Sequence, residues 1–182
     1  MRLAPIEKPP TLKTRIAAWM MKRQLGRVIT PAQVIYHRVP KALDISWAIM
    51  KFEAGGLAID SSLRILVKTW GAMLNRCGFC VDIARAQAVM SRLGLEKFEA
   101  LPGWRTSPLF DDRERAALAY VEEATRTKLV SDATFAELTK HFDEREIAEL
   151  TLLNAIENFY NLLNLPLEVE ADGLEALAVA EA

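Results

Sequence analysis

The feature that most constrains the fold is a run of apolar side chains at helical spacing in the middle of the chain. These side chains recur every three or four residues, which places them on one face of an α-helix: Leu63, Leu66, Val67, Trp70 and Leu74. Asp60 directly precedes the run and is a natural N-cap. The pattern predicts a long amphipathic helix over residues 60–74 that packs against a core.

The rest of the chain also favours helices. No segment shows sustained alternation of apolar and polar residues or an Asn-Gly hairpin, so we expect an all-α protein, a compact multi-helix subunit. Prolines, capping residues and glycines predict helices over 11–26, after Pro31, after Pro40 as far as Gly55, and from about Arg76 to Leu93 before Gly94. Residues 95–101 are expected to form a short helix or a turn. Three more helices are expected from Asp111 or Asp112 to about Lys128, from Ser131 to about Phe142, and from Asp143 to just before Pro166.

Length and composition predict a single domain over residues 1–182. The chain is 51% hydrophobic and 26% charged, which is ordinary for one globular core. Residues 1–30 are expected to form an extended, proline-rich arm and a peripheral amphipathic helix. That helix should pack through its apolar side chains, Leu12, Ile16, Trp19 and Met20, and expose a cationic rim. Residues 167–182 are expected to form a frayed tail.

Charge and hydropathy exclude several classes of function. The net charge is −1, so the chain has no general attraction for nucleic acid. It has no apolar run of about 20 residues and no signal-peptide pattern near Met1, so we expect no membrane span and a cytoplasmic location. His37 and His141 lie far in sequence from the two cysteines, so we expect no metal site, and no motif indicates a cofactor.

The motif that carries chemistry is Cys77-Gly78-Phe79-Cys80. A cysteine in the first turn of a helix faces unpaired backbone N–H groups and the positive end of the helix dipole, and both lower the thiol pKa. Arg76 adds a positive charge beside the motif. Three-residue spacing places both sulfurs on one helix face, close enough for a disulfide. The pattern favours dithiol-disulfide cycling, and the alternative is a pair of small apolar residues packed in the core.

Several segments around this motif resemble the carboxymuconolactone decarboxylase and alkylhydroperoxidase D superfamily. The similar segments are residues 63–67, 74–82, 104–110, 114–119, 130–142, 146–150 and 158–161. The resemblance covers roughly residues 40–166, which we take as the family-like core. It implies an all-helical subunit that forms homo-oligomers, with the CxxC motif at the N-terminus of a core helix. It also implies that Cys77 and Cys80 are the catalytic residues.

The chain departs from the peroxidatic branch of this family at its proton relay. That branch has a glutamate twelve residues before the first cysteine and a histidine four residues after the second, and here these positions are Ile65 and Ala84. Asp82 matches the motif but points away from Cys80 on a helix, so we expect it to be structural or to pair with Arg85.

A base must therefore come from elsewhere in the fold. His37, Glu53 and Glu157 are the possible sources, and His141 is a weaker one because it lies at a helix end. One helix also carries a polar stripe made of Asn154, Glu157, Asn158 and Asn161. The stripe is expected to form hydrogen bonds between helices or subunits, and the alternative is that it lines a pocket.

The sequence predicts a thiol-disulfide oxidoreductase or a weak peroxide-reducing antioxidant enzyme of the peroxiredoxin type. Its partners would be a small hydroperoxide or a protein thiol reductant, with no nucleic acid involved. Two alternatives stay open. One is a decarboxylase-like enzyme, for which no cluster of histidine and arginine provides local support. The other is a non-catalytic oligomeric module whose thiols are merely packed.

Overall fold

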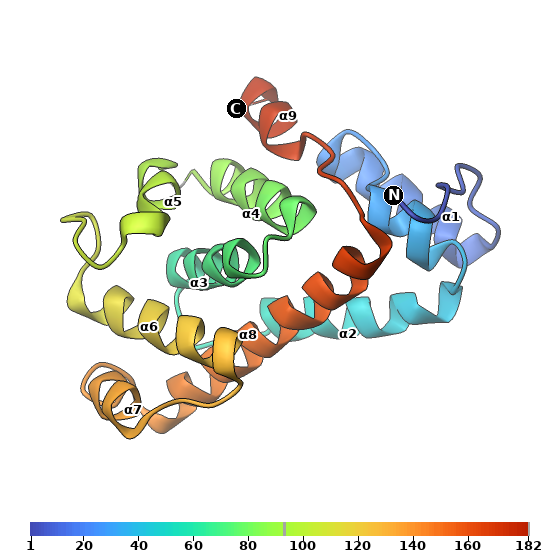
Figure 1. Cartoon of the computed structure of the whole chain (residues 1–182). Helices are drawn as coiled ribbons and strands as arrows, with labels where there is room; N and C mark the ends of the chain where they lie inside the picture. Colours follow the sequence, from blue (N-terminus) through green and yellow to red (C-terminus); the bar gives the residue numbers. More distant parts are fainter. Residues whose placement is uncertain (93, 182) are drawn as a thin grey trace.

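The computed structural model describes residues 1–92 and 94–181, and over these ranges it is helical, with no strand (Figure 1). The α-helices are α1 (Leu12–Leu25), α2 (Leu43–Ala54), α3 (Ser61–Leu74), α4 (Gly78–Met90), α5 (Glu96–Ala100), α6 (Asp112–Thr127), α7 (Asp132–Leu138), α8 (Glu144–Asn164) and α9 (Leu174–Glu181). Short helical turns lie at Ala32–Tyr36, Pro40–Ala42, Leu101–Gly103 and Leu165–Leu167. Among the described helices, none has the length and apolar character needed to cross a bilayer.

Helices begin where side chains satisfy the free backbone N–H groups of the first turn. Asp60 and Ser131 accept such hydrogen bonds at α3 and α7. Asp111 with Glu114, and Asp143 with Glu146, form complete capping boxes at α6 and α8, so the predicted start of each helix is confirmed.

Two predicted boundaries were wrong. Helix α7 ends at Leu138 rather than at Phe142, because the chain turns there to place Asp143 in the extended conformation of an N-cap. Helix α4 begins at Gly78 rather than Arg76, which has a left-handed φ of 58°. The expected last residue of that helix, Leu93, lies outside the described residues.

Helix α3 lies at the centre of the protein and contacts α4, α6 and α8. Its predicted apolar face is buried: Leu63, Leu66, Val67 and Trp70 are each at most 8% exposed. These side chains pack with Trp104, Leu118, Val121, Leu150 and Leu153 from the surrounding elements. Burial of this apolar surface stabilises the fold and fixes α3, which leads directly into the CxxC motif.

The expectation of a frayed tail was wrong. Residues 168–173 run without regular secondary structure from the turn at Leu165–Leu167 to α9, and α9 packs against α4 (Figure 1). Val169 and Leu174 are buried in the cluster that surrounds the cysteines. The N-terminal arm is held by the same region, because the backbone N–H of Arg2 donates to the carbonyl oxygen of Leu167. The tail therefore forms part of the fold near the CxxC motif.

Helix α1 has the predicted bounds, with Thr11 as N-cap and Gly26 as left-handed C-cap, but it packs through a different face. Its buried residues are Thr14, Ala17 and Ala18. The large apolar side chains that were expected to pack are instead exposed: Leu12, Ile16, Trp19 and Met20. The interior therefore accepts the small side chains, and the large ones remain on the surface.

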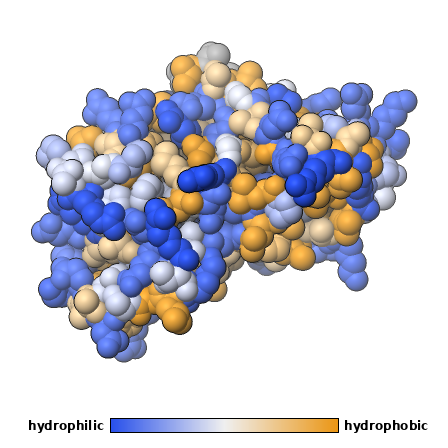
Figure 2. Space-filling model, in the orientation of Figure 1, coloured by the Kyte–Doolittle hydropathy of each residue, from blue (hydrophilic) through white to orange (hydrophobic). Residues whose placement is uncertain are grey.

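Helix α2 also leaves most of its apolar surface uncovered. Leu43 is the only residue of α2 that is buried, whereas Ile45 is 51%, Trp47 38% and Met50 54% exposed. Lys13 of α1 lies over the Trp47 ring and pairs with Asp44, which links the two helices. Figure 2 shows hydrophobic surface over the region of α2. We call Leu12, Ile16, Trp19, Ile45, Trp47 and Met50 together the α1–α2 apolar face.

Candidate active site around the Cys77–Cys80 disulfide

A tight connection between α3 and α4 positions the two cysteines. Arg76 adopts its left-handed conformation directly after α3, and the Cys77 N–H then donates to the carbonyl oxygen of Ala72 at 3.0 Å. This fixes Cys77 as the N-cap of α4 and places Cys80 in the first turn. The Arg76 side chain is exposed, and within the described residues it forms no hydrogen bond or ion pair.

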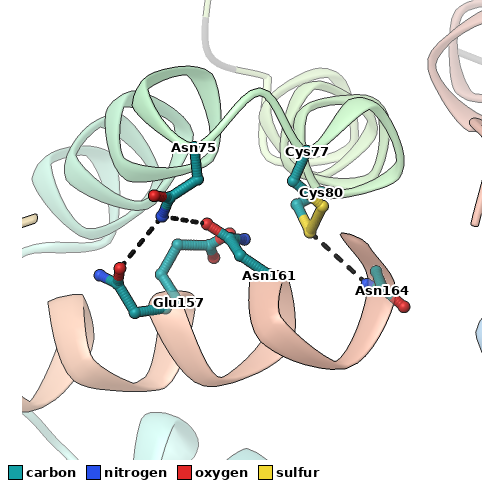
Figure 3. The surroundings of a disulfide bond; sticks show 7 residues. Asn75, Cys77, Cys80, Glu157, Asn161 and Asn164 are labelled. Carbon is teal, nitrogen blue, oxygen red and sulfur yellow. Dashed lines mark hydrogen bonds between the residues drawn. A yellow bond between two sulfur atoms is a disulfide. The ribbon is translucent and has the colours of Figure 1, made fainter. Parts of the chain in front are cut away.

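Cys77 and Cys80 form a disulfide, with their Cα atoms 5.3 Å apart (Figure 3). This separation lies in the usual range for disulfides, and the prediction that the sulfurs can bond is confirmed. Both residues are buried, Cys77 at 1% and Cys80 at 4% exposure. The disulfide lies at the N-terminal end of α4, where backbone N–H groups have no partner within the helix.

Apolar side chains close the space around the disulfide. Val34, Phe79, Val169 and Leu174 are buried in the same cluster as the cysteines. A cavity of about 530 Å³ between α1, α4 and α9 is lined by residues that include Gln24, Ala86 and Met90, and neither cysteine lines it. A reaction partner can reach the sulfurs only if part of this covering moves.

Helix α8 carries a polar stripe that faces the α3–α4 corner. Glu157, Asn161 and Asn164 are spaced by four and three residues and are all buried. The Asn75 side chain donates to Asn161 at 2.7 Å, Asn161 donates to Glu157 Oε1 at 2.6 Å, and Asn164 Nδ2 donates to Cys80 Sγ at 3.5 Å (Figure 3). The stripe thus has a buried carboxyl group at one end and the disulfide at the other, in two separate sets of hydrogen bonds.

The predicted role of the stripe in hydrogen bonding between helices is confirmed. Asn154 Oδ1 accepts from Thr125 of α6, and Asn158 Oδ1 accepts from Asn75. Asn164 was not predicted from the sequence, although it lies seven residues after Glu157 and therefore on the same face. That spacing was the available signal.

Glu157 is a buried acid with a perturbed pKa. Burial raises the pKa of Glu157 to about 7, although the charge of Lys68 and the hydrogen bond from Asn161 lower it. Lys68 pairs with Glu53 at 2.7 Å, so Glu53 and Glu157 lie near the same cation, and the charge of Glu53 raises the pKa of Glu157 further. Gly71 makes room for this acid, because a Cβ there would lie 3.3 Å from Glu157 Cγ.

The histidines occupy structural positions. The His37 ring is 4% exposed, and its Nδ1 bonds the carbonyl oxygen of Ile6 at 2.6 Å, which ties the N-terminal arm to the body. His141 lies 3.6 Å from Glu137 of α7. Of the residues considered as bases, the structure brings Glu53 and Glu157 together, and it uses His37 to hold the arm.

Asp82 has a structural role, which was one of the two roles predicted for it. Its carboxylate accepts backbone hydrogen bonds from Asp172, Leu174 and Glu175 at 2.9 to 3.1 Å. The alternative expectation, an ion pair with Arg85, was wrong, because Arg85 pairs with Glu175 at 2.7 Å. Asp82 therefore joins the CxxC helix to the segment that covers the cysteines.

Known proteins resemble this chain in sequence and in fold. The model of the carboxymuconolactone decarboxylase family matches residues 38–123. The uncharacterized protein YnjA of Escherichia coli K12 is 34% identical over 176 residues, which are 96% of each chain.

Two solved structures share the fold at lower identity. The alkylhydroperoxidase AhpD core of an uncharacterized peroxidase-related protein from Ralstonia eutropha JMP134 superposes with a TM-score of 0.79 at 15% identity, over 96% of both chains. A cysteine-to-alanine variant of the debrominase Bmp8, in complex with 2,3,4-tribromopyrrole, gives a TM-score of 0.79 at 18% identity, over 100% of this chain and 97% of the other. With its match to the family model and its similarity to YnjA, the chain belongs to the carboxymuconolactone decarboxylase family, and it shares its helical fold with the alkylhydroperoxidase AhpD core.

Proposed function

We propose that this protein is a thiol-disulfide oxidoreductase that uses Cys77 and Cys80 as its redox pair, with slow reduction of small hydroperoxides as a second activity. The observation that carries the proposal is the disulfide closed across the first turn of α4. At this position either sulfur, once reduced, is stabilised as a thiolate by the helix end.

The exchange reaction proceeds in two balanced steps. The thiolate of a reductant attacks one sulfur, the Cys77–Cys80 bond breaks, and the other cysteine leaves as a thiolate. A second reductant thiolate then attacks the mixed disulfide, which releases an oxidised reductant and leaves the protein as a dithiol. We propose only the chemical class of the reductant, which is a protein or small molecule that carries a thiol.

Hydroperoxide reduction would start from the dithiol. A cysteine thiolate attacks the terminal oxygen of the hydroperoxide, the O–O bond breaks, and one proton is taken up as the alcohol leaves. The resulting sulfenic acid condenses with the second thiol to give the disulfide and water. Because Ile65 and Ala84 carry no acid or base, we expect this step to lack general acid-base assistance, which typically contributes about 10²- to 10⁴-fold to rate.

The first test measures thiol exchange and peroxide turnover with the same protein. The reduced protein should reduce oxidised glutathione and re-form its own disulfide, and it should consume tert-butyl hydroperoxide much more slowly. Cys77→Ser and Cys80→Ser should each abolish disulfide formation while the helical circular dichroism is retained. Folded wild-type protein that keeps two alkylatable thiols after oxidant treatment would exclude the proposal.

Burial of the sulfurs favours a second candidate function, a non-catalytic module with packed thiols. Cys77 and Cys80 are 1% and 4% exposed, and neither lines the cavity between α1, α4 and α9. In such a module, the disulfide of the folded protein would resist a small reductant such as dithiothreitol until the protein unfolds. Reduction at a rate far above that of global unfolding would contradict it.

The homo-oligomer that the resemblance implies is part of this proposal. The α1–α2 apolar face leaves large side chains in water, among them Trp19 at 60% and Met50 at 54% exposure. Exposed apolar surface of this kind is typical of contacts between proteins. We propose that a second copy of the chain covers it.

A further inference from the structure

We propose that the side-chain amide of Asn164 is a positioning group that stabilises the Cys80 thiolate and so makes Cys80 the leaving sulfur when the disulfide is cleaved. This inference rests on the proposed thiol-disulfide exchange. It adds a residue from α8 to a site whose other members belong to α4.

Three observations place Asn164 at this sulfur. Its Nδ2 donates to Cys80 Sγ at 3.5 Å, and the residue is 3% exposed, so little water competes for either group. Asn164 is the last residue of α8, and its carbonyl oxygen accepts the N–H of Val169 at 3.1 Å. The backbone of Asn164 is therefore fixed by the end of α8 and by the segment that begins near Val169, and this keeps its amide at the disulfide.

The other atom of the same amide has no partner. Asn164 Oδ1 is buried and forms no hydrogen bond among the described residues. A buried acceptor without a partner is costly, and a role in redox chemistry is one explanation for such an atom. In the reduced protein, the S–H of a protonated Cys80 can donate to Oδ1 when the amide turns over, and Nδ2 then takes the place without a partner.

The amide thus serves Cys80 in both of its protonation states. When a thiolate attacks the sulfur of Cys77, the S–S bond breaks and its electron pair goes to Cys80, whose new negative charge receives the Nδ2–H of Asn164. Hydrogen bonds to charged groups are stronger than those to neutral groups, so the amide lowers the pKa of the Cys80 thiol. A thiol of lower pKa leaves faster in exchange.

The test measures the pKa of Cys80 directly, without a substrate. In a Cys77→Ser background, Cys80 is the only thiol, and the pH dependence of its alkylation rate by iodoacetamide gives its pKa. Asn164→Leu keeps the approximate size of the side chain but removes the donor. It should raise this pKa by about one unit, a tenfold smaller thiolate fraction below the pKa. Asn164→Asp adds a nearby negative charge and should raise the pKa further.

A matched control separates this role from a general effect on α8. Asn158→Ala removes another side-chain amide from the same helix, one that bonds Asn75, Asn154 and Thr125 rather than a cysteine. Asn75 keeps its hydrogen bond to Asn161 in this variant. The variant should leave the pKa of Cys80 unchanged. If Asn164→Leu does not fold, Asn164→Asp decides the question. An unchanged pKa in a folded Asn164 variant would overturn the proposal.

The two proposals fail in different ways. If the pKa of Cys80 rises in the Asn164 variants but the protein exchanges no disulfides, Asn164 still stabilises the thiolate and the proposed function is wrong. If the protein exchanges disulfides and the pKa does not depend on Asn164, the function stands and the role of Asn164 is excluded.

Discussion

At the scale of single residues, the site contains a carboxyl group in an environment that resists its ionisation. Glu157 is 5% exposed, and burial raises its pKa to about 7. The charged groups near it are Lys68, which favours ionisation, and Glu53, which opposes it. Tyr160, on the same helix, has its pKa raised to about 12, also chiefly by burial. Near neutral pH, Glu157 is thus the group in this cluster that exchanges a proton.

The raised pKa of Glu157 predicts how the stability of the protein depends on pH. The folded state holds a proton on this group between pH 4.5, its ordinary pKa, and about 7, whereas the unfolded state has released it. Protonation of Glu157 therefore stabilises the folded state fully below pH 4.5, and this stabilisation is lost as the pH rises through 7. The free energy of unfolding falls by at most about 3 kcal/mol over this range.

Glu157→Gln tests this dependence. In the wild type, the free energy of unfolding should decrease between pH 5 and pH 8 as Glu157 ionises. In the variant this decrease should be smaller, as measured by urea denaturation at each pH. Glu144→Gln is the control, because Glu144 lies exposed at the start of the same helix. A Glu157→Gln profile with the wild-type slope would show that this group is already ionised in the folded protein at low pH.

At the scale of elements, Asp82 couples the CxxC helix to the segment that covers the disulfide. The three backbone N–H groups that it accepts belong to Asp172, Leu174 and Glu175. The carboxylate of Asp172 in turn accepts from Thr30 and pairs with Arg27. These contacts hold Val169 and Leu174 over the cysteines. Access to the sulfurs should therefore depend on how firmly this segment is bound.

Asp82→Asn should make the disulfide easier to reach. The amide keeps one acceptor oxygen but loses the charge that strengthens the hydrogen bonds from the segment, at a cost of about 1 to 2 kcal/mol. Reduction by dithiothreitol should then become about tenfold faster, as followed by alkylation and mass measurement. Asp132→Asn, at an exposed position in α7, should have no effect. An unchanged rate in Asp82→Asn would mean that the sulfurs are reached by a route that does not involve this segment.

Most helices could be predicted because their starting signals are local. Asp143 and Glu146 define the start of α8 within four residues, and Asp60 does so for α3. Helix α9 could not be predicted in this way, because it is short and its order depends on Asp82, about 90 residues earlier in the chain. The packing face of α1 was predicted wrongly, because periodicity shows that Leu12 and Trp19 share a face but not whether the subunit itself covers it.

In the candidate site, too, the local features could be predicted and the contacts between distant segments could not. Cys77 and Cys80 could be identified from their spacing, since both lie within one helical turn. The contact between Asn164 and Cys80 depends on how α8 crosses the α3–α4 corner, which no local pattern specifies. The same crossing brings Glu157 near Lys68 and Glu53.

At the scale of the whole molecule, the surface is uneven in a way that a single subunit does not explain. Helices α3, α6 and α8 all contribute buried apolar residues to one core, whereas Leu43 is the only residue of α2 that is buried. A helix with so little buried surface gains little from packing within the subunit. Helix α2 is linked to α1, which also exposes large apolar side chains, through the ion pair between Lys13 and Asp44. We therefore expect the α1–α2 apolar face to be covered in the functional assembly.

The double substitution Ile45→Glu and Met50→Glu tests that expectation. Both side chains are more than half exposed in the subunit, so two carboxylates there should change its own stability little, whereas burying them in a contact between subunits would be strongly unfavourable. The wild type should sediment as an oligomer and the variant as a monomer of 20.4 kDa with the same circular dichroism. Leu129→Glu, at a side chain 77% exposed between α6 and α7, should leave the oligomer intact. If the wild type is a monomer at all concentrations, the face has another occupant; if the double variant remains an oligomer, the contact lies on another surface.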